Sequence, residues 1–336
     1  MPPGELRGPR EGGGAPPDED SGSEAEPSLA GLTYKEACKE LRVIACRLWL
    51  TACDGESAEC GLQHYGIGKL GANPLAVSLR LNEAITALNL SDNGLGADGV
   101  CAILGALKTG APALRNLNIS QNQAGPEGAD ALCELLVAEG GHPLASLDFG
   151  ANAIGDKGAA AVAKGLEADV RLTSLCLAKN EIDAGAAALG AALGVNRSLT
   201  SLDLEWNSIS EHSSRAIADA LGKTSSLKAI DLSWNGLGDG GVSHLAKRLS
   251  SRPDDGRQLA QLRLAHNRMS HVGTRALTAA FKSLDGVDLS GNPLGADGAY
   301  LLLRARAAEA SRGHDVTLVA TDVCIRPDAP LAGLLA

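Results

Sequence analysis

Three glycine-rich strings have the spacing of a phosphate-binding loop. They run from Gly66 to Gly71, from Gly94 to Gly99 and from Gly236 to Gly241, each as GxGxxG. Between a strand and a helix, such a string can hold a pyrophosphate against backbone N–H groups. All three, however, fall at one phase of a repeating sequence unit, with the last glycine at the expected start of a helix. Repetition in register is typical of a structural turn, so we predict neither a nucleotide site nor a cofactor.

The other catalytic candidates fail on spacing or position. Gly222, Lys223 and Thr224 resemble the end of a Walker A loop, but Ile217 stands where the first glycine of that loop should be. The triplet also ends a predicted helix instead of beginning one. The seven histidines show no HExxH spacing and the eight cysteines no CxxC pair. We therefore predict no metal site and no enzyme activity, and interpret the cysteines as reduced, mostly buried thiols of an intracellular protein.

The elements that must position these residues are copies of one short unit. A leucine or close substitute lies three, five and eight residues before each of eight asparagines, as Leu204, Leu202 and Leu199 do before Asn207. Apolar residues ten and usually fourteen after the asparagine share one face of a helix. The asparagines recur at intervals of 25 to 32 residues, which indicates a repeat array. They are Asn93, Asn122, Asn152, Asn180, Asn207, Asn235, Asn267 and Asn292.

Each unit is expected to form a strand, an asparagine turn, a helix and a return loop. Stacked units give an α/β solenoid, a horseshoe with a parallel sheet on its concave face and helices on its convex face. The asparagine amide can both donate to and accept from backbone groups at the strand end. A degenerate first copy has Tyr65 in the asparagine's place, and the Asn180 unit has its glycine and helix leucines one place early, as a deletion in the turn would produce.

The LxxLxLxxN core, the helical half and a period near 28 resemble the ribonuclease-inhibitor-type leucine-rich repeats. Ribonuclease inhibitor, Ran GTPase-activating proteins and NOD-like receptor sensors share these repeats, and the resemblance covers roughly residues 57–312. It implies a leucine-rich-repeat solenoid and says little about function. Tyr34, Cys38 and residues 316–325 also resemble small cytoplasmic leucine-rich-repeat-containing proteins of animals and protists.

Four segments are expected along the chain. Residues 1–29 are rich in Pro, Gly, Ser and Glu, which predicts a disordered acidic tail. Residues 30–56 are expected to form an N-terminal cap of helix or helix plus strand, because an open solenoid end exposes leucines. The repeats, one degenerate and eight regular, occupy 57–312. Residues 313–336 are expected to add a cap strand and a loosely packed tail.

Charge and hydropathy limit the classes of partner and the cellular compartments that fit this sequence. The formal net charge of −10 gives no support to nucleic-acid binding. The first residues lack the apolar core of a signal peptide, and the most apolar early run, 41–53, is too short to span a bilayer. We therefore predict a cytoplasmic protein, including cytoskeletal or ciliary assemblies, that binds neither nucleic acid nor membrane.

Two return loops are longer than the others. They cover residues 139–143 and 250–258, the second of which contains SSRPDDGRQ. Loops of unequal length on one rim of a solenoid are suited to binding, but insertions also accumulate where they do least harm. The sequence leaves both interpretations open.

The inner surface carries the candidate binding residues. Because side chains alternate along a strand, the residue inside each LxL motif faces the concave side. We call this row the acidic stripe, since aspartate is its commonest residue. It comprises Asn89, Asn118, Asp148, Cys176, Asp203, Asp231, Arg263 and Asp288.

Two tryptophans stand directly before their asparagines on neighbouring strands. Trp206 and Trp234 should lie about 4.8 Å apart, the spacing of paired strands. His266 occupies the equivalent position in the next unit, and Glu205 directly precedes Trp206. With the acidic stripe they make an aromatic patch with charged flanks, which is typical of interface anchors. Alternatively, each tryptophan merely covers its turn.

The favoured function is a non-catalytic protein-binding scaffold that uses the concave face, with a partner that has a basic surface. The alternative is a GTPase-activating regulator of a Ran-like small GTPase, which the resemblance implies. Against it, Ran GTPase-activating proteins carry a strongly acidic region after the repeats, whereas this chain ends in CIRPDAPLAGLLA. A third alternative, the ligand-binding part of an innate sensor, lacks a nucleotide-binding domain in this chain.

Overall fold

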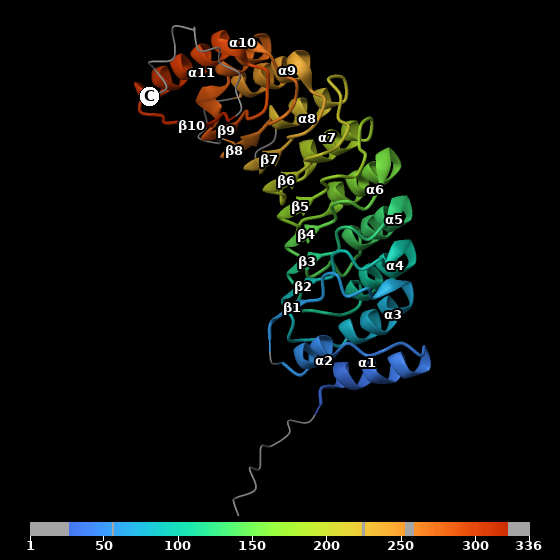
Figure 1. Cartoon of the computed structure of the whole chain (residues 1–336). Coiled ribbons are helices and arrows are strands. Elements are labelled where there is room, and N and C mark those ends of the chain that lie inside the picture. The colour runs from blue at the N-terminus through green and yellow to red at the C-terminus, as the bar shows by residue number, and fades with distance from the viewer. Residues whose placement is uncertain (1–26, 56, 224–225, 253–258, 322–336) are drawn as a thin grey trace, which may run out of the picture.

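The computed structural model describes residues 27–55, 57–223, 226–252 and 259–321. Most of the predicted acidic tail, most of the long loop at 250–258 and the predicted C-terminal tail lie outside these described residues. The described part forms a single curved array, with one strand and one helix per unit (Figure 1).

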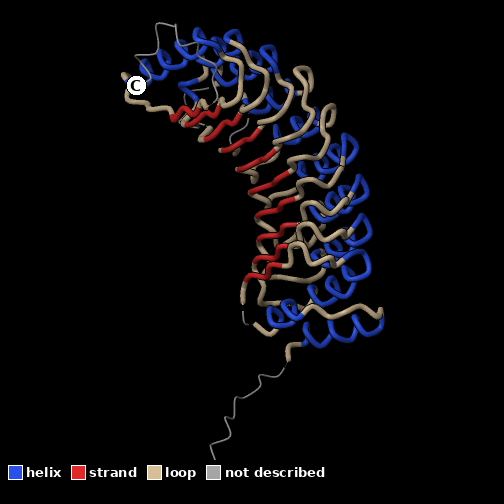
Figure 2. Tube along the Cα trace, in the orientation of Figure 1, coloured by secondary structure: helices blue, strands red, loops and turns tan. Residues whose placement is uncertain are grey.

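One parallel sheet lines the inside of the curve, as Figure 2 shows. Its strands pair in chain order from first to last, and the middle residue of each strand is opposite the middle residue of the next. The predicted fold is therefore confirmed. The strands are β1 (Glu59–Gly61), β2 (Ala87–Asn89), β3 (Asn116–Asn118), β4 (Ser146–Asp148), β5 (Ser174–Cys176), β6 (Ser201–Asp203), β7 (Ala229–Asp231), β8 (Gln261–Arg263), β9 (Gly286–Asp288) and β10 (Thr317–Val319).

The helices form the outer layer of the curve (Figure 2). Helices α3 to α11 each follow one strand of the repeat array, while α1 and α2 precede the sheet. The helices are α1 (Leu29–Glu40), α2 (Arg47–Cys53), α3 (Gly68–Leu79), α4 (Gly96–Leu107), α5 (Gly125–Leu136), α6 (Gly155–Ala168), α7 (Ala186–Val195), α8 (Ser214–Leu221), α9 (Gly238–Ser250), α10 (His271–Thr278), the 3₁₀ turn η1 (Phe281–Ser283) and α11 (Gly295–Ala310).

The core lies between these two layers. In the Asn207 unit, Leu202 of β6, Leu204 directly after it, and Ile217 and Leu221 of α8 are each at most 1% exposed. Burial of one such side chain contributes about 1.5–3 kcal/mol. The contribution depends on the neighbouring unit, because adjacent helices such as α7 and α8 pack directly on each other.

The repeat asparagines tie each unit to the one before it. Asn122 is fully buried, and its Oδ1 accepts from the backbone N–H of Asn93 at 3.0 Å. Its Nδ2 donates to the carbonyl of Leu90 at 2.9 Å and to that of Ile119 at 3.1 Å. One side chain thus satisfies backbone groups of two consecutive units, which buried polar groups require.

Helix starts differ from the sequence-based expectation. The pattern places the start at the last glycine of each GxGxxG string, whereas the helices begin at the second, Gly68, Gly96 or Gly238, with φ of 64°, 64° and 57°. A left-handed φ favours glycine at this turn. The last glycine lies one turn inside the helix, where a Cβ on Gly99 would be 3.0 Å from the Cβ of Ala72 on the neighbouring helix.

Three units lack the helix-start glycine and use an aspartate of the preceding unit instead. Asp156 Oδ1 accepts from the backbone of Asp183 and of Gly185, both at 2.8 Å. Asp183 and Asp239 accept in the same way from Ser210 and Ser270. This explains why α7 begins later than the regular units: its turn is held from outside by a carboxylate.

Helices cover the first strand of the sheet, and one further strand follows the last repeat. Residues 30–56, expected as a cap of helix or helix plus strand, contain α1 and α2 joined by a short loop, with no strand among the described residues. The Trp49 indole is fully buried and donates from Nε1 to Ser78 Oγ in α3 at 3.0 Å. At the other end, β10 pairs with β9. No helix of the described part is long and apolar enough to cross a membrane.

A candidate protein-binding face

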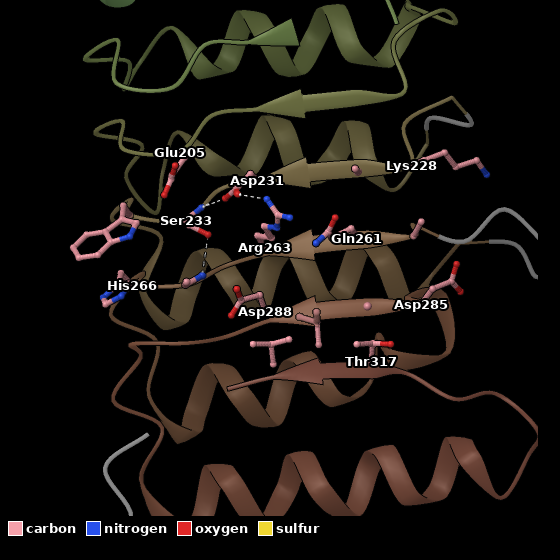
Figure 3. A pocket seen from close by; sticks show the side chains of 17 residues that line it. Glu205, Lys228, Asp231, Ser233, Gln261, Arg263, His266, Asp285, Asp288 and Thr317 are labelled. Atoms are coloured by element: carbon pink, nitrogen blue, oxygen red, sulfur yellow. Dashed lines mark hydrogen bonds and ion pairs between the residues drawn. The ribbon is translucent and has the colours of Figure 1, made fainter. Parts of the chain in front are cut away.

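Two grooves lie at the C-terminal half of the solenoid. The inner groove is on the concave face over β7 to β10, and Figure 3 shows its lining. The rim groove lies where the chain turns from β6, β7, β8 and β9 towards the helix side. Trp234 and His266 line both grooves. The inner groove is also lined by Glu205, Lys228, Asp231, Ser233, Gln261, Arg263, Asp285, Asp288, Thr317 and Val319, and the rim groove by Trp206, Ser208, Ser210, Arg268, Gly291 and Pro293.

Three stacked rings separate the grooves. The ring centroids of Trp206 and Trp234 are 4.2 Å apart at an interplanar angle of 12°. Those of Trp234 and His266 are 3.7 Å apart at 18°. At one end, Lys179 Nζ lies 5.8 Å from the Trp206 ring centroid. At the other end, a Cβ on Gly291 would collide with the His266 ring, so the glycine makes room for it. We call Trp206, Trp234 and His266 the aromatic column.

The backbone aligns the column. Trp206, Trp234 and His266 adopt φ of 54°, 56° and 54° at the end of their strands. Their N–H groups donate to the next unit, for example Trp206 to the Ser233 carbonyl at 3.0 Å. Since every unit repeats this conformation, side chains at this position project in one row at the strand spacing.

Most acidic-stripe residues have a structural bond as well as an exposed edge. Asp203 Oδ1 accepts from the N–H of Glu205 at 2.8 Å, and Asp231 Oδ1 from that of Ser233 at 2.8 Å. Asn89, Asn118, Asp148 and Asp288 make the same bond two residues on. Such local Asx bonds explain the recurrence of Asp and Asn. The stripe therefore reflects turn chemistry as well as surface charge.

Arg263 is the exception in the stripe. A guanidinium has no acceptor atom, so it cannot hold the N–H two residues on. Ser233 Oγ of the preceding unit accepts from the Ala265 N–H at 3.2 Å instead. Arg263 reaches across to Asp231, with Nη1 3.3 Å from Oδ2, and its side chain is 48% exposed.

Carboxyl pKa values are raised in the inner groove and in the hollow that adjoins it. Burial raises the pKa of Asp203, and the nearby Asp231 carboxylate adds to the rise. Burial also raises the pKa of Glu205, with Asp231 and Asp203 adding to it. Burial and Asp203 raise the pKa of the Cys176 thiol, whose Sγ donates to Asp203 Oδ2 at 3.5 Å. The electrostatic environment therefore disfavours further negative charge.

The structure does not bring all the predicted site residues together. The inner groove gathers Trp234, His266, Glu205, Asp231, Arg263 and Asp288. Trp206 faces the rim groove, and Asp203 lies in an adjoining hollow with Cys176. Asp148 lies in a separate hollow over β1 to β4. Asp148 is therefore remote from the aromatic column.

The sequence pattern missed several lining residues. Gln261 and Thr317 are the first residues of their strands and face the groove, as do Arg263 and Val319 two places further on (Figure 3). Strand alternation, applied in both directions from each middle leucine, would have identified them. Asp285 and Lys228 lie just before strands, where no periodicity marks them. Among the described residues, no three His, Cys, Asp or Glu side chains could hold a metal ion.

Comparisons with known proteins match the repeats. The leucine-rich-repeat family model matches residues 82–104, 142–163, 195–211 and 224–246. The human NACHT, LRR and PYD domains-containing protein 12 is 30% identical over 143 residues, which are 42% of this chain and 12% of that protein. The chain thus corresponds to a small part of this relative's length.

Two solved structures are similar to this chain at low sequence identity. The leucine-rich-repeat-containing protein LegL7 of Legionella pneumophila is 19% identical with a TM-score of 0.49, over 80% of this chain and 83% of that one. An internalin of Listeria monocytogenes is 16% identical with a TM-score of 0.38, over 92% and 95%. The four matched segments, together with the recurring strand, asparagine turn and helix, show that the chain contains leucine-rich repeats and folds as a leucine-rich-repeat solenoid.

Proposed function

We propose that this protein is a non-catalytic binding module that holds a protein partner against the aromatic column and the two grooves beside it. The observation that carries the proposal is the column itself. Trp206 and Trp234 are 46% and 38% exposed although they stack on each other. Large aromatic side chains held rigid at a surface are the usual anchors of protein interfaces.

The turns do not need these rings. Ala151 and Gly291 occupy the same position in other units with φ of 52° and 64°, close to the 54° of Trp206. Ala151 also donates its N–H to the next unit as Trp206 does. A bulky side chain at positive φ is strained in comparison with glycine. We infer that the rings serve recognition and that covering the turn is incidental.

The partner is expected to present a basic surface. Four carboxylates line the inner groove, Glu205, Asp231, Asp285 and Asp288, against Lys228 and Arg263. Arg263 is already paired with Asp231. Complementary charge speeds association and selects the partner's orientation. The cytoplasm remains part of this proposal; all seven described cysteines have free thiols, which suits a reducing compartment.

The test is a comparison of captured proteins. Full-length wild type and a Trp206→Ala, Trp234→Ala double variant are immobilised, and bound proteins from a cell lysate are identified by mass spectrometry. We expect at least one protein to be retained by the wild type and lost from the double variant. Tyr300→Ala removes a similarly exposed ring, 45%, from α11 on the convex side and should retain it. An unchanged set of captured proteins would refute the proposed face.

The GTPase-activating alternative stays a prediction with a direct assay. The purified protein is added to a GTP-loaded Ran-like GTPase and hydrolysis is followed. The binding-module proposal expects no acceleration. An increase in the hydrolysis rate would replace the proposal with the regulator, and the aromatic column variants would then show whether the same face is used.

A further inference from the structure

Glu205 interrupts a row of small residues. The residue two places before each repeat asparagine is Ser, Gly or Ala in seven of the eight regular units. These small residues are mostly buried between the acidic stripe and the row that contains the column. Glu205 alone places a long carboxylate there, beside the column. The seven are Ser91, Ser120, Gly150, Ala178, Ser233, Ala265 and Ser290.

The Glu205 carboxylate has no partner of its own. Within the described residues, no hydrogen bond or ion pair reaches its side-chain oxygens; only its backbone is bonded. It lines the inner groove with Asp231 and Trp234, and Figure 3 shows it near Asp231 and Ser233. Burial raises its pKa, Asp231 and Asp203 raise it further, and the charges of Lys179 and Arg263 offset only part of this rise. A cation from outside would relieve this repulsion.

The groove already accepts one guanidinium. Arg263 Nη1 lies 3.3 Å from Asp231 Oδ2, and Asp231 is only 13% exposed there. Asp231 uses its other oxygen for the Ser233 N–H. The internal pair therefore occupies Asp231 and leaves Glu205 as the unpaired carboxylate at this end of the groove.

Building on the proposed function, we propose that the partner inserts an arginine side chain into the inner groove and that Glu205 binds its guanidinium beside Trp234. A planar guanidinium can bind a carboxylate through two parallel hydrogen bonds and is less strongly hydrated than an ammonium. The column walls the groove on one side, and exclusion of water strengthens such a pair. Glu205 is thus the specificity residue, and the column is the anchor.

The three tryptophans allow this to be tested by NMR. The indole N–H signals of ¹⁵N-labelled full-length protein are followed during titration with acetyl-Gly-Ser-Arg-Ser-Gly-amide. A peptide with citrulline, a neutral analogue of the same shape as arginine, is the matched ligand control, and a lysine peptide tests the choice of cation. Trp49 is fully buried at the cap and serves as an internal reference.

We expect the arginine peptide to shift the Trp234 signal but not that of Trp49, with a dissociation constant at least threefold lower than for citrulline. Glu205→Gln should remove that difference. Glu167→Gln makes the same charge change on an exposed position of α6 and should leave it intact. No shift of the Trp234 signal, equal binding of both peptides, or a Glu205→Gln variant that still discriminates would each overturn the inference. Equal binding by the lysine peptide would overturn the choice of arginine.

The two experiments distinguish a wrong arginine assignment from a wrong proposed function. If the tryptophan double variant still loses its captured protein while Glu205→Gln binds both peptides as the wild type does, only the arginine assignment falls. If the double variant loses nothing, the proposed function falls.

Discussion

The rings of Trp206 and Trp234 stack at 4.2 Å and 12° although neither is required by the backbone that holds it. We therefore expect each ring to contribute little to stability. Trp206→Ala should lower the free energy of unfolding by about 1–2 kcal/mol, roughly the value of one aromatic stack with some lost burial. Trp234→Ala should lower it by about 1–3 kcal/mol, because Trp234 stacks on both Trp206 and His266. Urea unfolding followed by circular dichroism measures this.

Ala151 provides the natural precedent for the substituted position. A loss of more than about 4 kcal/mol, the range of a fully buried core aromatic, would show that the rings hold the turn. Trp49→Ala is the comparison for that range, because Trp49 is fully buried and hydrogen-bonded.

Substitution of a repeat asparagine should destabilise the fold more than substitution of Trp206 or Trp234. Asn207 is 8% exposed; its Nδ2 donates to the carbonyls of Leu177 and Leu204, and its Oδ1 accepts from Asn180 and Ile182. Asn207→Ala leaves these backbone groups unsatisfied, at about 1–3 kcal/mol each before relaxation. We expect a loss of at least about 3 kcal/mol in urea unfolding.

Asn116→Ala is the matched control, because Asn116 is exposed on β3 and its side chain makes no hydrogen bond within the described part. It should change the unfolding free energy by less than about 0.5 kcal/mol. Equal losses in both variants would mean that the asparagine ladder does not hold the units together.

The sequence predicts the parts of this molecule that repeat. Strand positions, the concave sheet and the neighbouring tryptophans follow from period and alternation, because each unit obeys the same local rule. The environment of Glu205 does not follow, since it depends on Asp231 one strand away. The turn before α7 likewise depends on Asp156, which lies in the preceding unit and which periodicity alone does not mark.

The buried pair of His142 and Asp169, on the rim formed by the return loops, should determine how the stability of the fold changes at acid pH. His142 Nε2 lies 2.9 Å from Asp169 Oδ1, and both side chains are at most 2% exposed. Burial alone would raise the pKa of Asp169, but bonds from His142 and from the N–H groups of Leu172 and Arg171 outweigh it and lower the pKa. A lowered carboxyl pKa contributes stability above its unfolded value near 4 that is lost as pH falls through the folded value.

We therefore expect Asp169→Asn to lower the unfolding free energy at pH 7 by about 1–3 kcal/mol, and expect this difference to shrink below about pH 4. Thermal unfolding between pH 3 and 7 measures both. Asp130→Asn, at an exposed position of α5, should show no such dependence. A difference that persists unchanged at pH 3 would assign the loss to packing instead of charge.

The contribution of Glu205 to the free energy of unfolding should have the opposite pH dependence. Its carboxylate is placed to bind a partner and destabilises the free protein. Its pKa is raised by burial and by Asp231, so the folded state holds a proton at Glu205 more tightly than the unfolded state does. Ionised Glu205 therefore costs stability at pH 7, and this cost disappears as pH falls from the raised value towards about 4.

Glu205→Gln should consequently unfold at a slightly higher temperature than the wild type at pH 7, with equality near pH 4. The gain should stay below about 1 kcal/mol, since the side chain is only partly buried and water screens it. Glu167→Gln should change nothing at either pH. A Glu205→Gln variant that is less stable at pH 7 would reveal an internal partner for the carboxylate, and Glu205 would then be a structural residue with no free charge to offer an arginine.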